Sequence, residues 1–243
     1  MAIQCCFKRV EKKYLLSRAQ YEAIRRGIEG RVKPDEHPQY TICNVYYDTP
    51  DYRLIRASLE KPVYKEKLRL RSYGPARETD PVFVELKKKF DGVVYKRRVT
   101  VTAGEAAAWM AGGRPEKESQ ISREIDWFLQ SYRPEPKVFL AYDREALAGV
   151  EDPELRVTFD TGIRCREREM DLRCGDQGIL LLPEDQVLME LKLPGTTPLW
   201  LARLLGENRV YPTSFSKYGT FYQQKLAGRI PATAYQKEVL KGA

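Results

Sequence analysis

Histidine is almost absent from this chain of 243 residues, which contains one, His37. A Ser-His-Asp triad, a Cys-His pair or a metal site with several histidines is therefore nearly excluded. We expect His37 to lie in a loop, because it belongs to the run Pro34–Pro38 and such runs are typical of turns. Phosphoryl transfer and anion binding need only cations and a hard metal ion, so the lack of histidine excludes neither.

Paired cysteines and long apolar runs are also missing. The cysteines are odd in number, lack any C-x-x-C spacing and include one adjacent pair, which predicts a reducing cytoplasm. The N-terminal apolar run is too short for a signal peptide, and no run is long enough for a transmembrane helix. The five cysteines are Cys5, Cys6, Cys43, Cys165 and Cys174.

Cationic residues outnumber anionic ones, and the excess indicates an anionic partner. Lys and Arg number 42 and Asp and Glu 34, which gives a net charge of +8. A polyphosphate, a nucleotide, a nucleic acid or a lipid headgroup fits this charge. Hydrophobic residues make up 42% of the chain and aromatic residues 11%, which favours a globular protein over disorder. We expect a single domain over residues 1–243.

Hydrophobic periodicity predicts a β-dominated α+β fold with an antiparallel meander. Capping-box patterns at Ser17 with Gln20 and at Thr102 with Glu105 predict two helix starts, and the turn Lys89–Gly92 predicts a hairpin. After a first strand before Ser17, the predicted strands cover 41–48, 63–73, 81–89, 93–102, 137–144, 155–160, 163–167, 179–182 and 187–193, and the predicted helices cover 17–30, 103–110, 119–132, 198–205 and 217–227.

A row of cations follows one face of the strand predicted at 63–73. A period of two places Lys65, Lys67, Arg69 and Arg71 on that face and leucines on the other. Four cations in one row repel one another, so the row is either a solvated face or one that an anion neutralises. Six other strands have polar faces of the same kind: Arg9, Glu11 and Lys13; Glu85 and Lys87; Lys96 and Arg98; Tyr142 and Arg144; Arg156, Thr158 and Asp160; and Glu190 and Lys192.

Closing a sheet of such strands turns the shared polar face into a tunnel lined by cations, with helices covering the apolar face outside. Carboxylates recur among the cations, at Glu11, Glu85, Asp160 and Glu190. Each of them is either an ion-pair partner or, beside phosphate-binding cations, a ligand for a hard ion such as Mg²⁺ or Mn²⁺. We prefer Glu190 as the metal ligand, with Glu11 and Glu85 as the other candidates.

Eight motifs in register resemble a known family. They are Arg9–Tyr14, Val45–Thr49, Lys67–Tyr73, Val84–Lys87, Tyr142–Arg144, Arg156–Asp160, Met189–Lys192 and Ser214–Tyr218. In that order they resemble the VTC-type polyphosphate polymerase domain, one of the triphosphate tunnel metalloenzymes, which also include the CYTH proteins. The resemblance extends from about residue 7 to about residue 226.

The resemblance implies an eight-stranded antiparallel β-barrel whose tunnel binds a triphosphate, with Mn²⁺ or Mg²⁺ held by a glutamate. It implies that Arg69, Arg71, Lys192 and Glu190 are catalytic and that Glu190 holds the metal. Substrate-binding roles fall on Lys13, Lys87, Lys96, Tyr142, Arg144, Arg156, Ser216 and Lys217, to which the strand faces add Lys67 and Arg98. The partners implied are ATP, polyphosphate, and pyrophosphate or triphosphate; a membrane protein that removes the product is left open.

One departure from the family pattern concerns the metal. The CYTH signature has two glutamates before its lysine, and Arg9 occupies the first of those positions here. The loss of that acid indicates one metal site rather than two, and it favours transfer to another phosphate over simple hydrolysis.

Three functions stay open at this point. The first is a polymerase that transfers the γ-phosphoryl group of ATP to polyphosphate, the second a tunnel triphosphatase, and the third a non-catalytic sensor of polyphosphate or inositol phosphates. A nucleic-acid partner is not expected, because its cations would lie on an exposed patch with interleaved aromatics. The leucines opposite these cations, such as Leu68, Leu70, Leu86 and Leu191, instead require one buried face.

Overall fold

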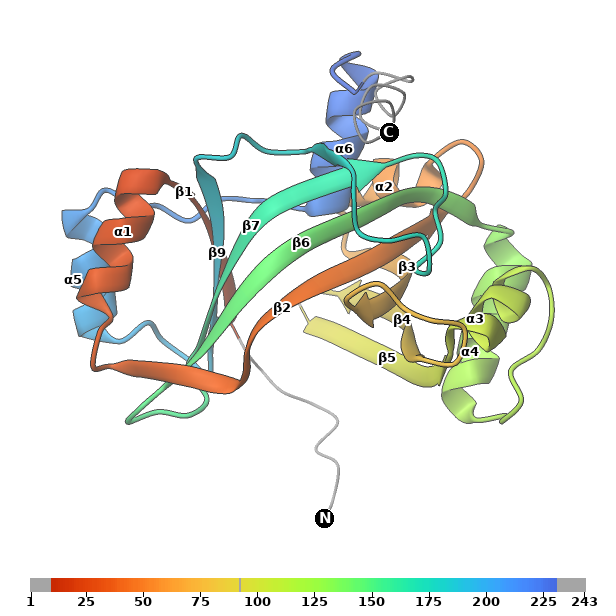
Figure 1. The fold of residues 1–243 in the computed structure, drawn as a ribbon, viewed down its shortest axis with the longest axis horizontal. Coiled ribbons are helices and arrows are strands. Elements are labelled where there is room, and N and C mark those ends of the chain that lie inside the picture. The colour runs from red at the N-terminus through yellow and green to blue at the C-terminus, as the bar shows by residue number, and fades with distance from the viewer. Residues whose placement is uncertain (1–9, 92, 231–243) are drawn as a thin grey trace, which may run out of the picture. The chain divides into compact units, whose positions relative to one another are not determined.

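The computed structural model describes residues 10–91 and 93–230 (Figure 1). Its strands are β1 (Val10–Ser17), β2 (Val32–Asp48), β3 (Tyr64–Tyr73), β4 (Pro81–Phe90), β5 (Val93–Thr102), β6 (Glu135–Gly149), β7 (Arg156–Arg166), β8 (Ile179–Leu180) and β9 (Gln186–Leu193). Its helices are α1 (Arg18–Gly27), α2 (Arg53–Leu59), α3 (Ala103–Met110), α4 (Gln120–Tyr132), α5 (Leu199–Glu207) and α6 (Lys217–Leu226).

The strands form a mostly antiparallel sheet, which confirms the predicted β-dominated fold. Their order is β1-β9-β7-β6-β2-β3-β4-β5, with β8 pairing to β7 beside this path. Within the described residues this order has two ends, so the sheet is not closed and the eight-stranded barrel was an overstatement. Alternation along each strand predicts which residues share a face, but closure needs a pairing between the first and last strands, which alternation does not determine.

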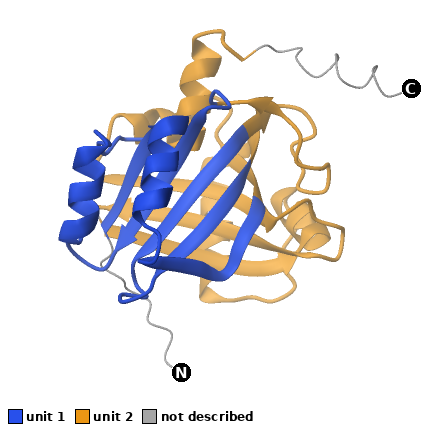
Figure 2. Ribbon diagram, turned by 60° about the vertical axis from the view of Figure 1, so that its left-hand side comes forward, with its two compact units in different colours: residues 1–41, 142–163, 182–215 blue, residues 42–141, 164–181, 216–243 orange. Residues whose placement is uncertain are grey.

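The chain forms two compact units, coloured separately in Figure 2. Unit 1 comprises Met1–Thr41, Tyr142–Ile163 and Leu182–Phe215; unit 2 comprises Ile42–Ala141, Arg164–Leu181 and Ser216–Ala243. Strands β2, β6 and β7 each contribute residues to both units. The single domain over residues 1–243 stays a prediction.

Unit 1 has its own hydrophobic core beneath α1 and α5. Alternate residues of three strands reach it, for example Tyr14 of β1, Phe159 of β7 and Met189 of β9. Ile24 of α1 and Leu201 of α5 pack against them and are fully buried. Helix α1 begins at the predicted capping box, where Gln20 N–H donates to Ser17 Oγ and Ser17 N–H donates to Gln20 Oε1.

Unit 2 has a second core, between the leucine face of its strands and helices α3 and α4. Leu68 of β3 and Leu86 of β4 meet Trp109 of α3 and Phe128 of α4, and all four are fully buried. Trp109 Nε1 donates to Asp126 Oδ1 over 2.6 Å, which ties the two helices together. The apolar faces predicted for β3 and β4 are therefore covered by helices.

Three local predictions were wrong, and one helix was not predicted. Residues 34–38, including His37, belong to strand β2 rather than to a loop, because proline fixes an extended backbone that an exposed strand segment accepts. Residues 155–160 and 163–167 belong to one strand, β7, which continues past Gly162 at φ 54°. The strand predicted at 179–182 is the two-residue β8, and α2 was not predicted.

Candidate functional site

Strand register in unit 2 gathers the predicted cations on one face. Arg69 of β3 lies opposite Glu85 of β4, which lies opposite Arg98 of β5. One pair further along, Lys67 lies opposite Lys87, which lies opposite Lys96. Because cross-strand neighbours have Cβ atoms about 5 Å apart, these side chains share one surface. The faces predicted from alternation are therefore confirmed here.

Four cations surround one carboxylate, and we call them with it the Glu85 cluster. Glu85 is 1% exposed; Oε2 accepts from Arg69 Nε at 2.8 Å and lies 3.8 Å from Arg71 Nε. Its Oε1 accepts from Arg98 Nε at 2.7 Å and lies 2.7 Å from Lys96 Nζ. Burial opposes ionisation of Glu85, but the charges of Arg69, Arg71 and Lys96 hold its pKa well below the usual range. Glu85 is a permanent anion among four cations.

Asn44 and Tyr46 of β2, which were not predicted as site residues, complete this face. Tyr46 Oη accepts a hydrogen bond from Arg69 Nη1 at 3.0 Å, and Asn44 Oδ1 accepts one from Arg71 Nε at 2.9 Å. Burial raises the pKa of Tyr46, but Arg69 and Arg71 outweigh burial and lower it to about 8. These two residues could have been found from the sequence, because alternation along the strand predicted at 41–48 places Asn44 and Tyr46 on one face and Val45 and Tyr47 on the other.

The start of helix α6 lies beside the cations of β3. Lys67 Nζ donates to Ser216 Oγ at 3.2 Å, and the same oxygen caps α6 by accepting from Gly219 N–H at 3.2 Å. Lys217 is the first residue of α6. The structure therefore brings the predicted Ser216 and Lys217 to the same part of unit 2 as Lys67.

Unit 1 carries a second set of predicted site residues on the strand face opposite its core. Lys13 of β1 lies opposite Glu190 of β9, which lies opposite Thr158 of β7. Glu190 is buried, with its carboxylate 3.9 Å from Lys13 Nζ and 3.3 Å from Lys192 Nζ. Lys13 Nζ also lies 3.6 Å from Glu11 and donates to the Phe215 carbonyl at 3.2 Å.

The remaining predicted cations of unit 1 have carboxylate partners. Arg144 binds Asp160 through two hydrogen bonds of 2.6 and 2.8 Å, and its guanidinium lies 5.3 Å from the ring centre of Tyr142. Arg156 pairs with Asp35 of β2. Unit 1 and unit 2 each bring together part of the predicted site; that both sets line a single lumen stays a prediction.

Two of the three candidate metal ligands, Glu85 and Glu190, differ in their surroundings. Four cations around Glu85 oppose the approach of another cation, so Glu85 does not fit as a metal ligand. Glu190 lies near Lys13 and Lys192 in unit 1 and opposite Thr158 in the pairing of β7 with β9. The described residues contain no cluster of three or more His, Cys, Asp or Glu suited to a metal. A hard ion on Glu190 would therefore take most of its oxygen ligands from phosphate and water. Arg9 lies outside the described residues.

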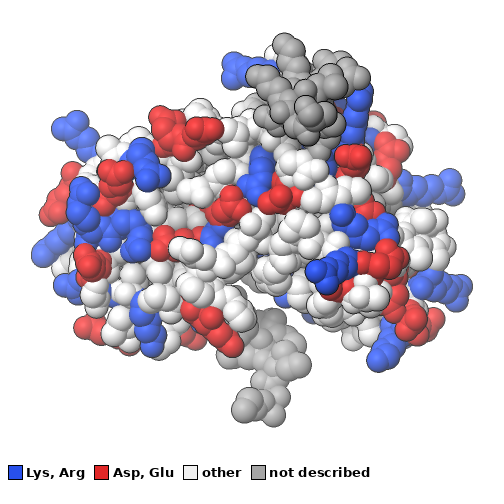
Figure 3. All heavy atoms as spheres, viewed as in Figure 1, with Lys and Arg blue, Asp and Glu red and all other residues white. Residues whose placement is uncertain are grey.

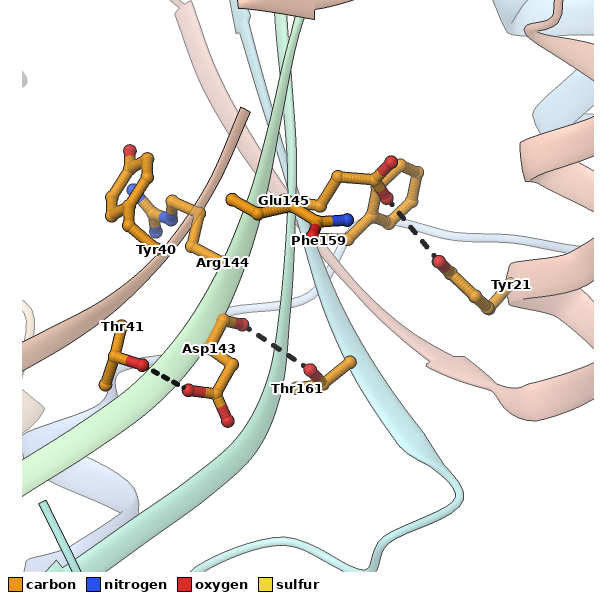
Figure 4. Close-up of a pocket in the computed structure, with 9 residues that line it drawn as sticks. Tyr21, Tyr40, Thr41, Asp143, Arg144, Glu145, Phe159 and Thr161 are labelled. Carbon is orange, nitrogen blue, oxygen red and sulfur yellow. Dashed lines mark hydrogen bonds between the residues drawn. The ribbon is translucent and has the colours of Figure 1, made fainter. Parts of the chain in front are cut away.

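A separate pocket of about 420 Å³ lies in unit 1, lined on one side by Arg144 (Figure 4). Two carboxylates enter its lining. Asp143 accepts a hydrogen bond from Thr41 at 2.7 Å, and Glu145 pairs with Arg25 at 2.8 Å. Because these carboxylates have partners, the pocket does not require a charged ligand.

The outer surface drawn in Figure 3 carries both signs of charge, with Asp and Glu side chains interspersed among Lys and Arg. A continuous basic patch of the kind that binds nucleic acid is not present on that face. Among the described helices, none has both the length and the apolar character needed to cross a bilayer.

The comparisons with known proteins agree with this arrangement. The sequence model of the VTC domain matches residues 8–225. A comparison with curated protein sequences finds no significant match. A Bacillus halodurans protein provisionally named an adenylate cyclase superposes with TM-score 0.55 and 13% identity, over 88% of this chain and 96% of that chain. HpAC1 of Hippeastrum, an adenylyl cyclase candidate described as having a dominant triphosphatase activity, gives TM-score 0.51 and 15% identity, over 88% and 95%. At these identities the likeness shows the fold alone.

Proposed function

Because the chain belongs to the VTC domain family, we propose that it is a metal-dependent polyphosphate polymerase. In this proposal it transfers the γ-phosphoryl group of ATP to a growing polyphosphate chain and uses Mn²⁺ or Mg²⁺. A cytoplasmic location, expected from the cysteine usage, is part of the proposal. Pyrophosphate or triphosphate would bind to the same cations.

The Glu85 cluster is the observation that carries this proposal. Four cations converge on one buried carboxylate, and Lys67 and Lys87 extend the same face. A single carboxylate leaves the cluster with a positive excess. A polyphosphate chain has one or more negative charges per phosphate and would neutralise that excess along its length. The long row of cations therefore favours a polyanion over a single phosphate group.

The residues of the chain can supply most of the chemistry. Arg69 and Arg71 would hold phosphate oxygens and stabilise the charge that develops on the transferring group. When bound at Glu190, the divalent ion would neutralise charge on the β- and γ-phosphates. The acceptor is a terminal phosphate oxygen that is already ionised near neutral pH, so no general base is required. This agrees with the single histidine of the sequence.

Hydrolysis is the second candidate. The fold likeness to HpAC1, which is described as having a dominant triphosphatase activity, supports a triphosphatase that transfers the same group to water. Polymerisation is preferred because the Glu85 carboxylate is engaged by four cations and is therefore a poor base for activating a water molecule.

One experiment separates the candidates. The purified chain is incubated with ATP and Mn²⁺, and the products are resolved on a gel that separates polyphosphate from orthophosphate. We expect polyphosphate from the parent and from R18Q, which removes an exposed cation of α1 that pairs with Glu22 on the same helix. We expect none from R69Q. Orthophosphate without polyphosphate would overturn the polymerase in favour of the triphosphatase, and binding of ATP without any product would support the sensor.

A further inference from the structure

Thr158 carries a buried hydroxyl that has no hydrogen-bond partner. The residue is 7% exposed, and its Oγ1 is the one buried side-chain oxygen or nitrogen left unpaired in the part of the chain that the structure describes. Burying a hydroxyl without a partner is costly, so native proteins rarely do so without a reason. Such an atom points to a ligand that completes its environment.

The position of Thr158 indicates where that ligand would lie. Thr158 lies directly opposite Glu190 in the pairing of β7 with β9. Their Cβ atoms are therefore expected to be about 5 Å apart on the same face. One ion between the two side chains could contact both the hydroxyl and the carboxylate.

The carboxylate directly opposite Thr158 could share a cation with its hydroxyl. Two carboxylates share its face, Glu190 opposite it and Asp160 two residues further along β7, together with Arg156 two residues before it, which lies opposite Lys192. Arg144 binds Asp160 through two short hydrogen bonds, whereas Lys13 Nζ and Lys192 Nζ lie 3.9 and 3.3 Å from the Glu190 carboxylate. A divalent ion at Glu190 would displace these two ammonium groups. Hydroxyl and carboxylate oxygens are the hard ligands that Mg²⁺ and Mn²⁺ prefer.

We propose that Thr158 Oγ1 is a second protein ligand, beside Glu190, for the divalent cation. The inference rests on the proposed function only in assuming that the protein uses such an ion. It assigns Thr158 to the metal rather than to a phosphate.

The test measures metal binding without nucleotide. Binding of Mn²⁺ to the full chain is followed by the loss of the free-ion electron paramagnetic resonance signal, for the parent, T158V, T158S and E190Q. Valine keeps the size of threonine without its hydroxyl, and serine keeps the hydroxyl. We expect T158V to bind Mn²⁺ about tenfold or more weakly, T158S to stay close to the parent, and E190Q to lose most binding.

Two further measurements make the test decisive. Thermal unfolding without metal should show T158V at least as stable as the parent, because it removes an unpaired hydroxyl. Calorimetry with tripolyphosphate in the presence of EDTA should give the same Kd for both proteins.

Equal Mn²⁺ affinity in T158V and the parent would overturn the proposal, as would no Mn²⁺ binding by the parent. Weaker metal-free tripolyphosphate binding with unchanged Mn²⁺ binding would assign the hydroxyl to phosphate and also overturn it. Weaker Mn²⁺ binding by T158V in a protein that makes no polyphosphate would support the metal site and reject only the polymerase.

Discussion

Tyr218 Oη donates a hydrogen bond of 2.9 Å to Oδ2 of the buried Asp48, 170 positions earlier in the sequence. The same carboxylate accepts the backbone N–H groups of Leu54 and Ile55, both at 2.9 Å. Asp48 thereby joins the first turn of α2 to α6, the helix that begins with Lys217 beside Ser216. Burial and the Asp48 carboxylate raise the pKa of Tyr218, so the phenol remains a donor at neutral pH.

Removing this hydroxyl should cost stability. Tyr218→Phe deletes one hydrogen bond to a buried carboxylate, and we expect a loss of about 1.5–3 kcal/mol in the free energy of unfolding. Urea unfolding followed by fluorescence measures it. Tyr211→Phe is the matched control, because Tyr211 is 70% exposed, and its effect should stay within about 0.5 kcal/mol. Equal stability of the Tyr218 variant and the parent would contradict the anchoring role.

Helix α2 shows why some of the fold could not be predicted from the sequence. It has seven residues, and Tyr52 at its N-cap has φ 61° and no capping side chain. Asp48 supplies the missing acceptors from outside the helix. Local capping rules therefore fail at α2, while they succeed at Ser17 and Thr102, where the cap and its partner are three residues apart.

Removing the charge of Glu85 should give a variant that tripolyphosphate stabilises more than it stabilises the parent. Glu85→Gln leaves Arg69, Arg71, Lys96 and Arg98 without their shared anion, and we expect a loss of about 3 kcal/mol in the free energy of unfolding, since three of the cations are partly exposed. Tripolyphosphate supplies negative charge to the same cations. It should therefore raise Tm more in this variant than in the parent, as measured by differential scanning fluorimetry.

Glu124→Gln is the control for that experiment. Glu124 pairs with Lys88 and Arg97, which belong to the opposite face of β4 and β5. Tripolyphosphate should not preferentially rescue this variant. An equal rise in Tm for both variants would show that tripolyphosphate does not bind specifically to the face that carries Glu85.

Affinity for a triphosphate should fall as pH rises through about 8. Burial lowers the pKa of Lys96 to about 8, against the opposing effect of Glu85, and the pKa of Tyr46 is also about 8. Above this pH Lys96 loses a positive charge and Tyr46 gains a negative one. A bound triphosphate favours the protonated forms, so linkage predicts about a tenfold loss of affinity per group between pH 7 and pH 9. Calorimetry at the two pH values measures it.

Lys96→Arg separates the two groups, because arginine keeps its charge over this range. The loss of affinity should shrink to the part due to Tyr46. An unchanged pH profile in this variant would exclude Lys96 as the titrating group.

The strand face on which a site residue lies could be predicted from the alternation of polar and apolar residues. Its interaction partner could not be predicted where that partner is distant in the sequence. The parity of β3 places Arg69 and Arg71 opposite the leucine face, and register confirms it. The partner of Arg156 is Asp35, 121 positions away in a segment interpreted as a loop. No local pattern contains that pairing. The missing partner of Thr158 Oγ1 likewise depends on packing, although parity places Thr158 on the polar face.

The last prediction tests catalysis against binding and also tests whether the two units serve one substrate. Arg71→Ala and Lys192→Ala each delete one cation, the first from unit 2 and the second from unit 1. If both line one tunnel, each should weaken triphosphate binding by about 1.5–3 kcal/mol. Lys12→Ala is the control, because Lys12 lies on the other face of β1, where its Nζ donates to Thr197 Oγ1 at 2.9 Å.

Measuring kcat for the same variants shows whether the two cations act in catalysis or only in binding. Charge accumulates on the transferring phosphoryl group in the transition state, so an enzyme should lose more in kcat than the loss in affinity accounts for. Calorimetry gives Kd, and polyphosphate formation with Mn²⁺ gives kcat on the same proteins. A loss in Kd from only one of the two variants would place the other cation outside the binding site. Losses confined to Kd, in a protein with no measurable kcat, would favour a sensor over a polymerase, because a sensor needs affinity for the ground state alone.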